Sequence, residues 1–185
     1  MFRRFGMTRT SMIWRPEFEA DHATNYDSDG NPFPPSRREH PDAAGSMSTT
    51  ARDWSALLAG LLRGEVLSAA TRAEMLRPQI RINSPHQFPV GSAEISHAND
   101  AIRLSYGLGW GVFFTPYGKA YFKEGHDDGV QSYCVSFDEA KTGIVIMTNS
   151  DNGESIFNEL LATLIGNTFT PWDWENFVPY DSRTP

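Results

Sequence analysis

The sequence has one cysteine, no cluster of basic residues and no long apolar run. A single cysteine, Cys134, excludes an intrachain disulfide, and its apolar neighbours favour a buried, inert thiol over a nucleophile. The net charge of -7 and the scattered Lys and Arg give no surface for nucleic acid or an anionic membrane. No run reaches about 18 apolar residues, so we expect no membrane span. The given chain starts without a signal-peptide core, and its compartment stays open.

The 185 residues are enough for one domain with a sizeable core. We predict a single α+β domain over residues 1–185 with three parts. These are a loop-rich and helical region (1–104), an antiparallel sheet with a C-terminal helix (105–166) and an aromatic tail (167–185).

The first 47 residues are rich in Pro, Gly, Asp and Asn, which predicts irregular structure with a short hairpin around residues 25–30. The Asp29-Gly30 pair is the turn signal, because glycine takes a positive φ without steric cost. Asp27 and Asp29 are calcium-ligand types, but the other ligands of a calcium loop are missing. We therefore predict no metal there.

Two helices are predicted after this region. Thr50 and Asp53 form a capping box that starts a helix at Ala51, with the Asp53 side chain reaching back to the cap. An apolar stripe then recurs at helical spacing and ends near Gly64. Its members are Trp54, Leu57, Leu58, Leu61 and Leu62. Ser68 caps a shorter helix through Leu76, which Pro78 ends.

Residues 79–101 are predicted to be mostly loop, of a length that often covers a site or a partner. Residues 105–114 alternate large side chains with glycines, which predicts one strand with a bare face. Residues 120–125 and 130–137 are further strands, and residues 144–149 form an apolar strand buried on both faces. Short links between these four strands predict an antiparallel meander.

A last amphipathic helix is predicted over residues 156–164, ending at Gly166 and covering one face of the sheet. The tail beyond it is unusually aromatic, so we expect it to dock on the body of the domain. Its aromatic residues are Phe169, Trp172, Trp174, Phe177 and Tyr180.

The stretch His126-Asp127-Asp128-Gly129 places charged and flexible groups between two predicted strands, where sites are usually built. It could also be simply a polar strand end. Metal binding by His126 and the two aspartates, helped by another histidine, is not favoured because no ligand spacing recurs.

Five segments together resemble the C-terminal half of the serine β-lactamase and penicillin-binding-protein-like hydrolases, closest to the class C-related esterases and peptidases. The resemblance covers residues 5–165. The segments are Phe5–Ser11 (Phe-Gly-Met-Thr-Arg-Thr-Ser), Ala43–Asp53 (Ala-Ala-Gly-Ser-Met-Ser-Thr-Thr-Ala-Arg-Asp), Tyr106–Gly111 (Tyr-Gly-Leu-Gly-Trp-Gly), Gly125-His126 and Ile144–Ser150 (Ile-Val-Ile-Met-Thr-Asn-Ser).

The resemblance implies an antiparallel sheet flanked by helices, with an active site in the groove beside an all-helical region. Such sites use a Ser-x-x-Lys, a Tyr-x-Asn or Ser-x-Asn, and a Lys-Thr-Gly or His-x-Gly on an edge strand. None of the three lysines follows a serine at that spacing, and no tyrosine stands two residues before an asparagine. The run Ser150-Asp151-Asn152 has the right letters, but it follows the last predicted strand and is predicted to cap a helix.

The third motif is present in altered form. The resemblance implies a catalytic role for His126, substrate contact by Asp127 and an oxyanion-binding backbone N–H at Gly129. Asp128 stands where the family has glycine, and its charge disfavours the carboxylate that β-lactams carry. A one-residue slip that places Gly129 at that position would remove this objection, and the sequence leaves both alignments open.

Two functions follow as hypotheses. In the first, the chain is the C-terminal part of a serine hydrolase that acts on a small ester, amide or β-lactam without a cofactor, and it is inactive without a complementing N-terminal half. In the second, it is a non-catalytic binding or assembly module, which predicts a homo-oligomer because part of the sheet would be exposed. The position of Met1, just before a family segment, favours the first.

Overall fold

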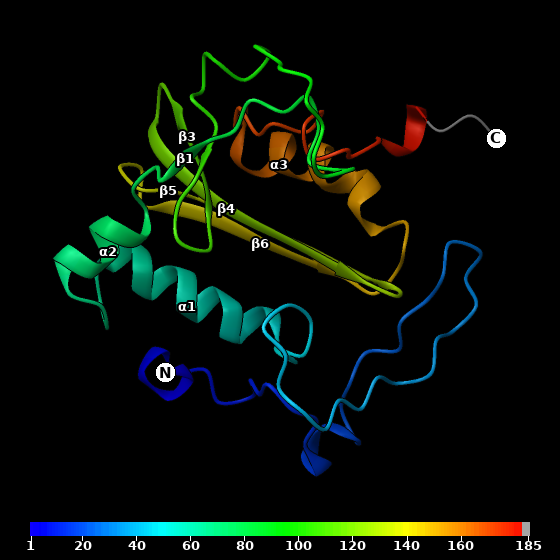
Figure 1. The fold of residues 1–185 in the computed structure, drawn as a ribbon. Coiled ribbons are helices and arrows are strands. Elements are labelled where there is room, and N and C mark those ends of the chain that lie inside the picture. The colour runs from blue at the N-terminus through cyan, green and yellow to red at the C-terminus, as the bar shows by residue number, and fades with distance from the viewer. Residues whose placement is uncertain (183–185) are drawn as a thin grey trace.

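The computed structural model describes residues 1–182. Its centre is a six-stranded antiparallel sheet in which neighbours in sequence are neighbours in space, from β1 to β6 (Figure 1). The strands are β1 (Ile80–Arg81), β2 (Ser105–Tyr106), β3 (Gly111–Thr115), β4 (Gly118–Asp127), β5 (Val130–Phe137) and β6 (Thr142–Thr148). The helices are α1 (Ala51–Arg63), α2 (Ala69–Met75) and α3 (Phe157–Ile165), with 3₁₀ turns η1 (Phe2–Phe5), η2 (Pro16–Phe18), η3 (Gly153–Ile156) and η4 (Tyr180–Ser182). The predicted fold class is confirmed, with six strands where four were expected.

Helix α1 begins and ends where the sequence predicted. The Thr50 hydroxyl accepts a hydrogen bond from the backbone N–H of Asp53 at 3.1 Å, which satisfies one of the free N–H groups of the first turn. The predicted return contact from the Asp53 carboxylate is wrong. That carboxylate is buried, and it accepts from the backbone N–H of Arg9 at 2.7 Å and from the hydroxyl of Thr10 at 2.8 Å. Asp53 therefore ties the N-terminal segment to the helix.

The predicted single strand over residues 105–114 is two strands joined by a tight turn. Tyr106 pairs with Gly111, so residues 107–110 reverse the chain between β2 and β3. Gly109 has a φ of +81°, a conformation that glycine adopts readily, and this makes the reversal possible. Gly111 has a different role: a Cβ there would lie 2.1 Å from the ring of Phe122, so the bare position lets that ring pack against the backbone.

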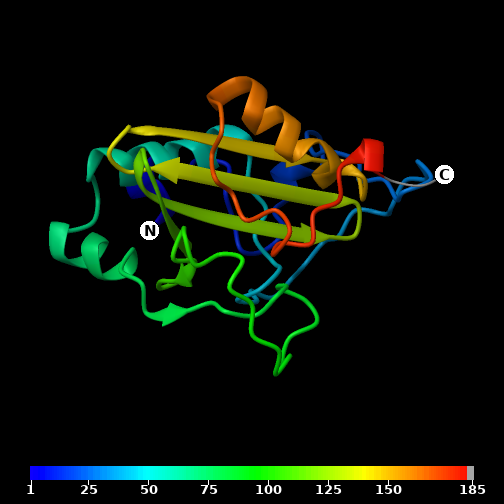
Figure 2. The same ribbon diagram turned by 90° about the horizontal axis from the view of Figure 1, so that it is seen from above.

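Alternation along the strands divides the buried side chains between two faces of the sheet. One face packs on α1 and η1, and its core includes Leu58, Leu61, Val112, Tyr121 and Cys134. The other face packs on α3 and the C-terminal tail, and its core includes Phe113, Phe122, Tyr133, Phe157 and Trp174. Figure 1 shows α1 below the strands and α3 above them, and Figure 2 shows the red C-terminal segment crossing the strands beside α3.

Strand β6 forms an edge of the sheet, so its burial is lower than predicted. Ile146 is its one buried residue, whereas Ile144 and Val145 are half-buried against opposite cores. The α3 helix and the docking of the tail are confirmed, although Tyr180 remains 55% exposed. The last three residues of the predicted tail lie outside the described residues. No helix within residues 1–182 has the length and apolar character needed to cross a membrane.

Candidate functional site

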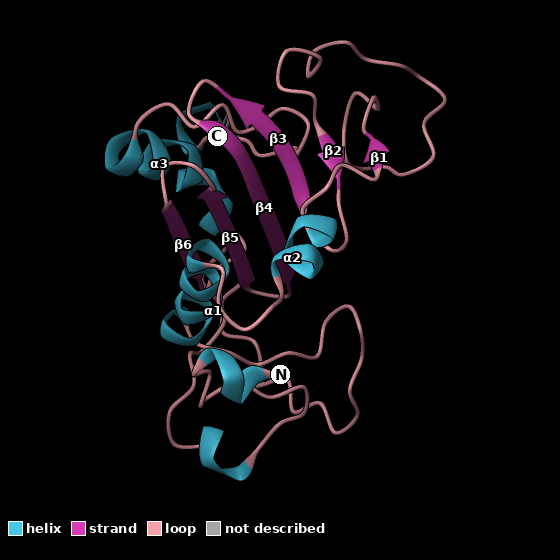
Figure 3. Cartoon of the chain, turned by 90° about the vertical axis from the view of Figure 1, so that its left-hand side faces the viewer, coloured by secondary structure: helices cyan, strands magenta, loops and turns pink. Residues whose placement is uncertain are grey.

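The predicted site residues lie at the far end of the β4–β5 hairpin. Strand β3 pairs with β4 only as far as Phe122, whereas β5 pairs with β4 through Asp127. One side of β4 over residues 123–127 therefore has no strand partner within residues 1–182. Figure 3 shows β3 to β6 side by side, with β1 and β2 beyond β3. An unpaired strand edge offers backbone N–H and C=O groups to another extended chain.

His126 and Asp127 are exposed neighbours on β4, and the pleat directs them to opposite faces of the sheet. The His126 ring lies 6.5 Å from the ring of Phe88, centroid to centroid, in an edge-on arrangement. Asp127 accepts a hydrogen bond from Arg38 at 2.8 Å on the face of the N-terminal segment. This ion pair is half-exposed, so its contribution to stability is small. The two side chains thus do not converge on one point.

Asp128 and Gly129 form the turn that joins β4 to β5. Asp128 is exposed, whereas Gly129 is buried with a φ of +66°. The backbone N–H of Gly129 donates to a carboxylate oxygen of Asp151 at 2.7 Å. A Cβ on Gly129 would lie 2.7 Å from Asn25 and from Phe33, so only glycine fits the close approach. In this structure the Gly129 N–H is therefore bound within the protein.

The segment packed on this turn is the predicted hairpin near the N-terminus. The two sides of this hairpin meet at an isolated bridge between Tyr26 and Pro32, which confirms the turn signal at Asp29-Gly30. Tyr26 also bridges to Ser150 beyond β6. The predicted helix-cap role of the Ser150–Asn152 run is wrong: Ser150 accepts from the Asn152 N–H at 3.1 Å within a turn, and η3 has no side-chain cap. Long-range contacts to the N-terminal hairpin and to Gly129 hold this run instead.

Sequence reasoning missed a group of buried and half-buried polar side chains on the His126 face. Glu124, two residues before His126, accepts from the side-chain amide of Gln87 at 2.8 Å and from Lys123 at 3.2 Å. Glu175, in the C-terminal tail, is 3% exposed and accepts from the Tyr133 hydroxyl at 3.4 Å. The signal available in the sequence was an acidic residue directly after the second of two tryptophans in a segment that was expected to dock.

Burial and neighbouring carboxylates set the protonation of this group. Burial, together with the charge of Glu124, raises the pKa of Glu175 well above its ordinary 4.5. Burial, with Glu124 and Glu175 nearby, raises the pKa of Tyr106 to about 12. Both groups are therefore favoured in their neutral forms over a broad range of pH.

The single cysteine is buried, as predicted. Burial raises the pKa of the Cys134 thiol to about 11, although its sulfur accepts a hydrogen bond from the Trp54 indole at 3.2 Å. A thiol with so little thiolate at neutral pH is a poor nucleophile. Among residues 1–182, no cluster of three or more His, Cys, Asp or Glu could hold a metal ion.

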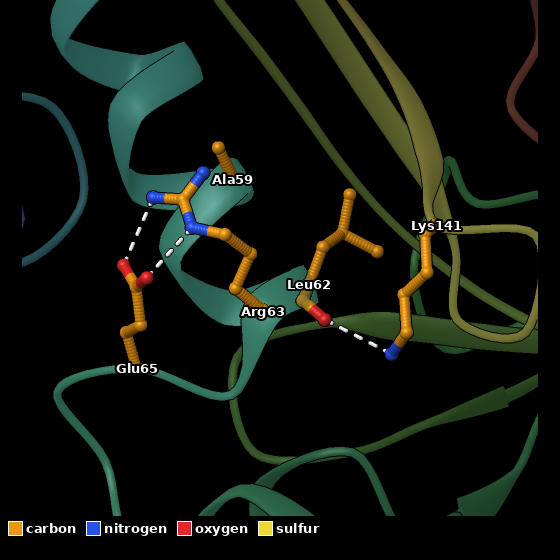
Figure 4. A pocket seen from close by; sticks show the side chains of 5 residues that line it. All are labelled: Ala59, Leu62, Arg63, Glu65 and Lys141. Carbon is orange, nitrogen blue, oxygen red and sulfur yellow. Dashed lines mark hydrogen bonds and ion pairs between the residues drawn. The ribbon is translucent and has the colours of Figure 1, made fainter.

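Two clefts lie outside the predicted site. The larger, about 570 Å³, is lined by Ala59, Leu62, Arg63, Glu65 and Lys141. Figure 4 shows its charged groups paired internally, with Arg63 on Glu65 and Lys141 donating to the Leu62 carbonyl at 2.9 Å. The smaller, about 330 Å³, lies between residues 80–87, Tyr106 and Trp174. His126 lines neither cleft.

Comparison with known proteins gives a consistent family. The family model described as Beta-lactamase matches residues 1–165. No curated protein matches the chain. Among solved structures, the chain is similar to the octameric penicillin-binding protein homologue from Pyrococcus abyssi, with a TM-score of 0.67 and 20% identity. It is also similar to the penicillin binding protein from Bacillus halodurans (TM-score 0.62, 21% identity) and to a class C beta-lactamase (TM-score 0.65, 14% identity).

The chain spans half or less of these solved structures. It is covered over 96%, 89% and 91% of its own length, but it accounts for only 38%, 46% and 50% of the three structures in the same order. At these identities the likeness shows the fold.

Proposed function

The chain belongs to the beta-lactamase family, and from that premise we propose that it supplies the sheet side of a serine-hydrolase site that forms an acyl-enzyme with an ester, amide or β-lactam. In this proposal His126 is the catalytic residue that this chain contributes, and the backbone edge of β4 beside it holds the substrate. A nucleophilic serine and its lysine come from sequence that this chain does not contain.

One observation carries the proposal. Strand β4 extends past β3, so among residues 1–182 it has no strand partner on one side over residues 123–127, a stretch that includes the exposed His126. A free edge can bind an extended substrate through backbone hydrogen bonds. A histidine at that edge can hold or donate a proton near the reacting group.

The sequence gives the reason to expect no activity from the chain alone. Acyl transfer needs a nucleophile with a base in hydrogen-bond reach, and neither Ser-x-x-Lys nor Tyr-x-Asn occurs among the 185 residues. Donors that remain after the nucleophile is lost cannot form an acyl-enzyme.

The substrate class follows from Asp128. Its exposed carboxylate lies one residue beyond the His126-Asp127 pair, where a β-lactam carboxylate would meet like charge. We therefore propose a neutral ester or amide in preference to a β-lactam. Asp127 would contact substrate only after releasing Arg38, and Gly129 would serve as an oxyanion donor only after releasing Asp151.

The test is steady-state hydrolysis of a chromogenic cephalosporin and of a p-nitrophenyl ester by the purified chain and by His126→Ala. We expect both proteins to match the buffer rate for both substrates. Saturable hydrolysis that the His126→Ala variant abolishes would contradict the proposal, because it would require a complete site on this chain.

A second candidate is a non-catalytic assembly module of the same fold. Two hydrogen bonds favour this candidate. The Gly129 N–H and the Asp127 carboxylate, both expected to face substrate, are bound to Asp151 and Arg38 of the same chain. In this case the free edge of β4 would pair with another copy of the chain. Light scattering would then give a dimer or a larger particle, whereas a stable monomer would contradict the module.

A further inference from the structure

The C-terminal segment 167–182 lies outside the part of the chain that the family model matches. It is nevertheless well packed: Trp174 is 4% exposed, and Trp172 and Phe177 stack on each other at 5.4 Å against the core around Tyr133. We call residues 167–182 the strap. Its course across the strands beside α3 is visible in Figure 2.

The strap binds one short stretch of the long loop before β2. The backbone N–H of Gln87 donates to the Trp174 carbonyl at 2.7 Å, and the Trp174 indole donates to the Ser84 hydroxyl at 3.1 Å. The backbone N–H of Phe88 donates to the side chain of Asn176 at 3.3 Å. The Nδ1 atom of His86 also lies 3.0 Å from the Asp173 carbonyl oxygen. Four contacts therefore fix residues 84–88 along the strap.

The same stretch contacts the exposed end of β4 on its other side. Gln87 reaches Glu124 through its side chain at 2.8 Å, and the Phe88 ring lies beside the His126 ring. Residues 84–88 are thus held between the strap and the strand that carries His126. Their position there depends on whether the strap stays docked.

One buried contact beneath the strap is unusual. Glu175 accepts a long hydrogen bond from the Tyr133 hydroxyl at 3.4 Å through one oxygen, and its other carboxylate oxygen is buried without a partner among the described residues. An unpaired buried carboxylate is costly, whereas a protonated carboxyl in the same place is much less so. The contact is therefore sensitive to the charge on Glu175.

The charged groups around Glu175 come from several elements. Glu124 on β4 and Glu154 on η3 disfavour a negative charge, whereas Lys123 on β4 and the Tyr133 hydroxyl on β5 favour it. Tyr106 on β2 faces the same carboxylates and stays neutral. Burial, the largest influence, also opposes the charge. No cation in this set forms a hydrogen bond with Glu175 in the described structure.

We propose that the strap positions residues 84–88 against the His126 end of β4, and that the buried Glu175–Tyr133 contact is a proton-dependent latch that holds the strap down. Glu175 is a positioning residue in this scheme, since it acts on His126 only through the strap and Phe88. The inference stands whether or not His126 takes part in catalysis.

The direction of the pH dependence follows from linkage. The docked strap keeps the pKa of Glu175 above its ordinary 4.5, so the docked state binds the proton more tightly than the released state. Docking is therefore strongest below about pH 4.5. It weakens as pH rises from there to the raised pKa and changes no further above it.

The test is amide hydrogen exchange of the full chain, expressed as protection factors from pH 4.5 to about pH 8. We expect the protection of the Gln87 amide to fall about tenfold or more in the wild type, because each unit of raised pKa corresponds to about a tenfold change. Glu175→Gln keeps the shape of the side chain without its charge, so its protection factor should change less than about twofold. Asp173→Asn, an exposed carboxylate in the same strap, should behave as the wild type.

Two further measurements separate the latch from general unfolding. The Trp54 amide, which donates to the Thr50 carbonyl at the start of α1 on the opposite face of the sheet, lies away from the strap and should change less than the Gln87 amide. Tyr133→Phe removes a hydrogen bond that favours ionised Glu175, so the fall in protection should extend to higher pH and become larger. This shift remains measurable if Glu175→Gln does not fold.

A separate variant tests the hydrogen bond between the strap and residue Phe88 of the loop. Asn176 has a φ of +63°, so Asn176→Gly retains the backbone conformation and removes only the acceptor for the Phe88 N–H. The Phe88 amide should lose protection several-fold while the Gln87 amide retains it. Unchanged protection of the Phe88 amide in Asn176→Gly would contradict the proposal that the strap positions residues 84–88. Identical pH profiles for wild type and Glu175→Gln would contradict the proposal that Glu175 is a proton-dependent latch.

Discussion

The two faces of the sheet each hold a carboxylate shielded from solvent, half-buried Asp138 and buried Glu175, and they treat it in opposite ways. On the α1 side, Asp138 forms a two-point ion pair with Arg72, and Lys119 and Lys141 lie within 3.7 Å and 3.6 Å of its carboxylate. Burial alone would raise the pKa of Asp138, but the hydrogen bond and charge of Arg72 lower it below 3.8. On the α3 side, no cation within residues 1–182 forms an ion pair with Glu175, and burial raises its pKa.

The two carboxylates therefore differ in how their contacts depend on pH. The Asp138 pair joins α2 to the β5–β6 turn at any pH at which aspartate is ionised. The Glu175 contact joins the strap to β5 most firmly when the carboxyl is neutral. The α1 face thus belongs to the constant framework, and the α3 face carries the segment that can respond to conditions.

The largest expected effect tests whether the two faces contribute equally to the core. Leu61 and Leu161 are almost fully buried on the α1 and α3 faces, so Leu61→Ala and Leu161→Ala should each lower the free energy of unfolding by about 3 kcal/mol. Leu164→Ala, on the exposed side of α3, should change it by less than about 0.5 kcal/mol. Urea denaturation measures all three. A loss at only one buried leucine would show that one face dominates.

The next effect concerns the ion pair. Arg72→Met leaves the half-buried Asp138 without its main partner and should cost about 2–3 kcal/mol at pH 7. Because the native pKa of Asp138 is lowered, the pair stabilises the protein above about pH 3.8, and this stabilisation is lost as pH falls through the native pKa. The gap between wild type and variant should therefore close in acid. A gap that is constant down to low pH would show that packing by Arg72, and not its charge, is responsible.

The turn between β4 and β5 gives a somewhat smaller effect. Gly129→Ala combines a positive φ with contacts of 2.7 Å to Asn25 and Phe33, and should destabilise the protein by about 2 kcal/mol. Gly30→Ala has a similar φ but open space around the new methyl group, and should cost about 1 kcal/mol or less. Thermal unfolding of the two variants isolates the steric part. Equal losses would mean that the N-terminal hairpin does not press on the turn.

The smallest expected change in the free energy of unfolding is that of Glu175→Gln, which should be close to zero at low pH. Glu175→Gln should match the wild type in free energy of unfolding below about pH 4.5 and exceed it at higher pH, by about 1.4 kcal/mol for each unit of raised pKa. Chemical denaturation at several pH values measures the difference, with Asp173→Asn as the control. A variant that is less stable than wild type at neutral pH would contradict the contrast between the two faces.

The sequence predicted the elements that depend on local patterns. The cap at Thr50, the stripe on α1 and the aromatic tail each carry a signal within a few residues, and the structure places all of them as expected. The two-strand nature of residues 105–114 was missed because a tight turn between short strands continues the same alternation of large residues and glycines.

The environment of the candidate site could not be predicted in the same way. The partners of Asp53, Gly129 and Glu175 are separated from them by 44, 22 and 42 residues, and no local pattern encodes such contacts. The placement of His126 and Asp127 on opposite faces was within reach, because neighbouring residues of a strand always alternate.

The central claim, that this chain carries part of a serine-hydrolase site without its nucleophile, is tested most directly by intact-mass measurement after exposure to an excess of a fluorophosphonate. The account predicts that the purified chain keeps its unmodified mass of 20.7 kDa. A stoichiometric adduct on the chain alone would contradict it.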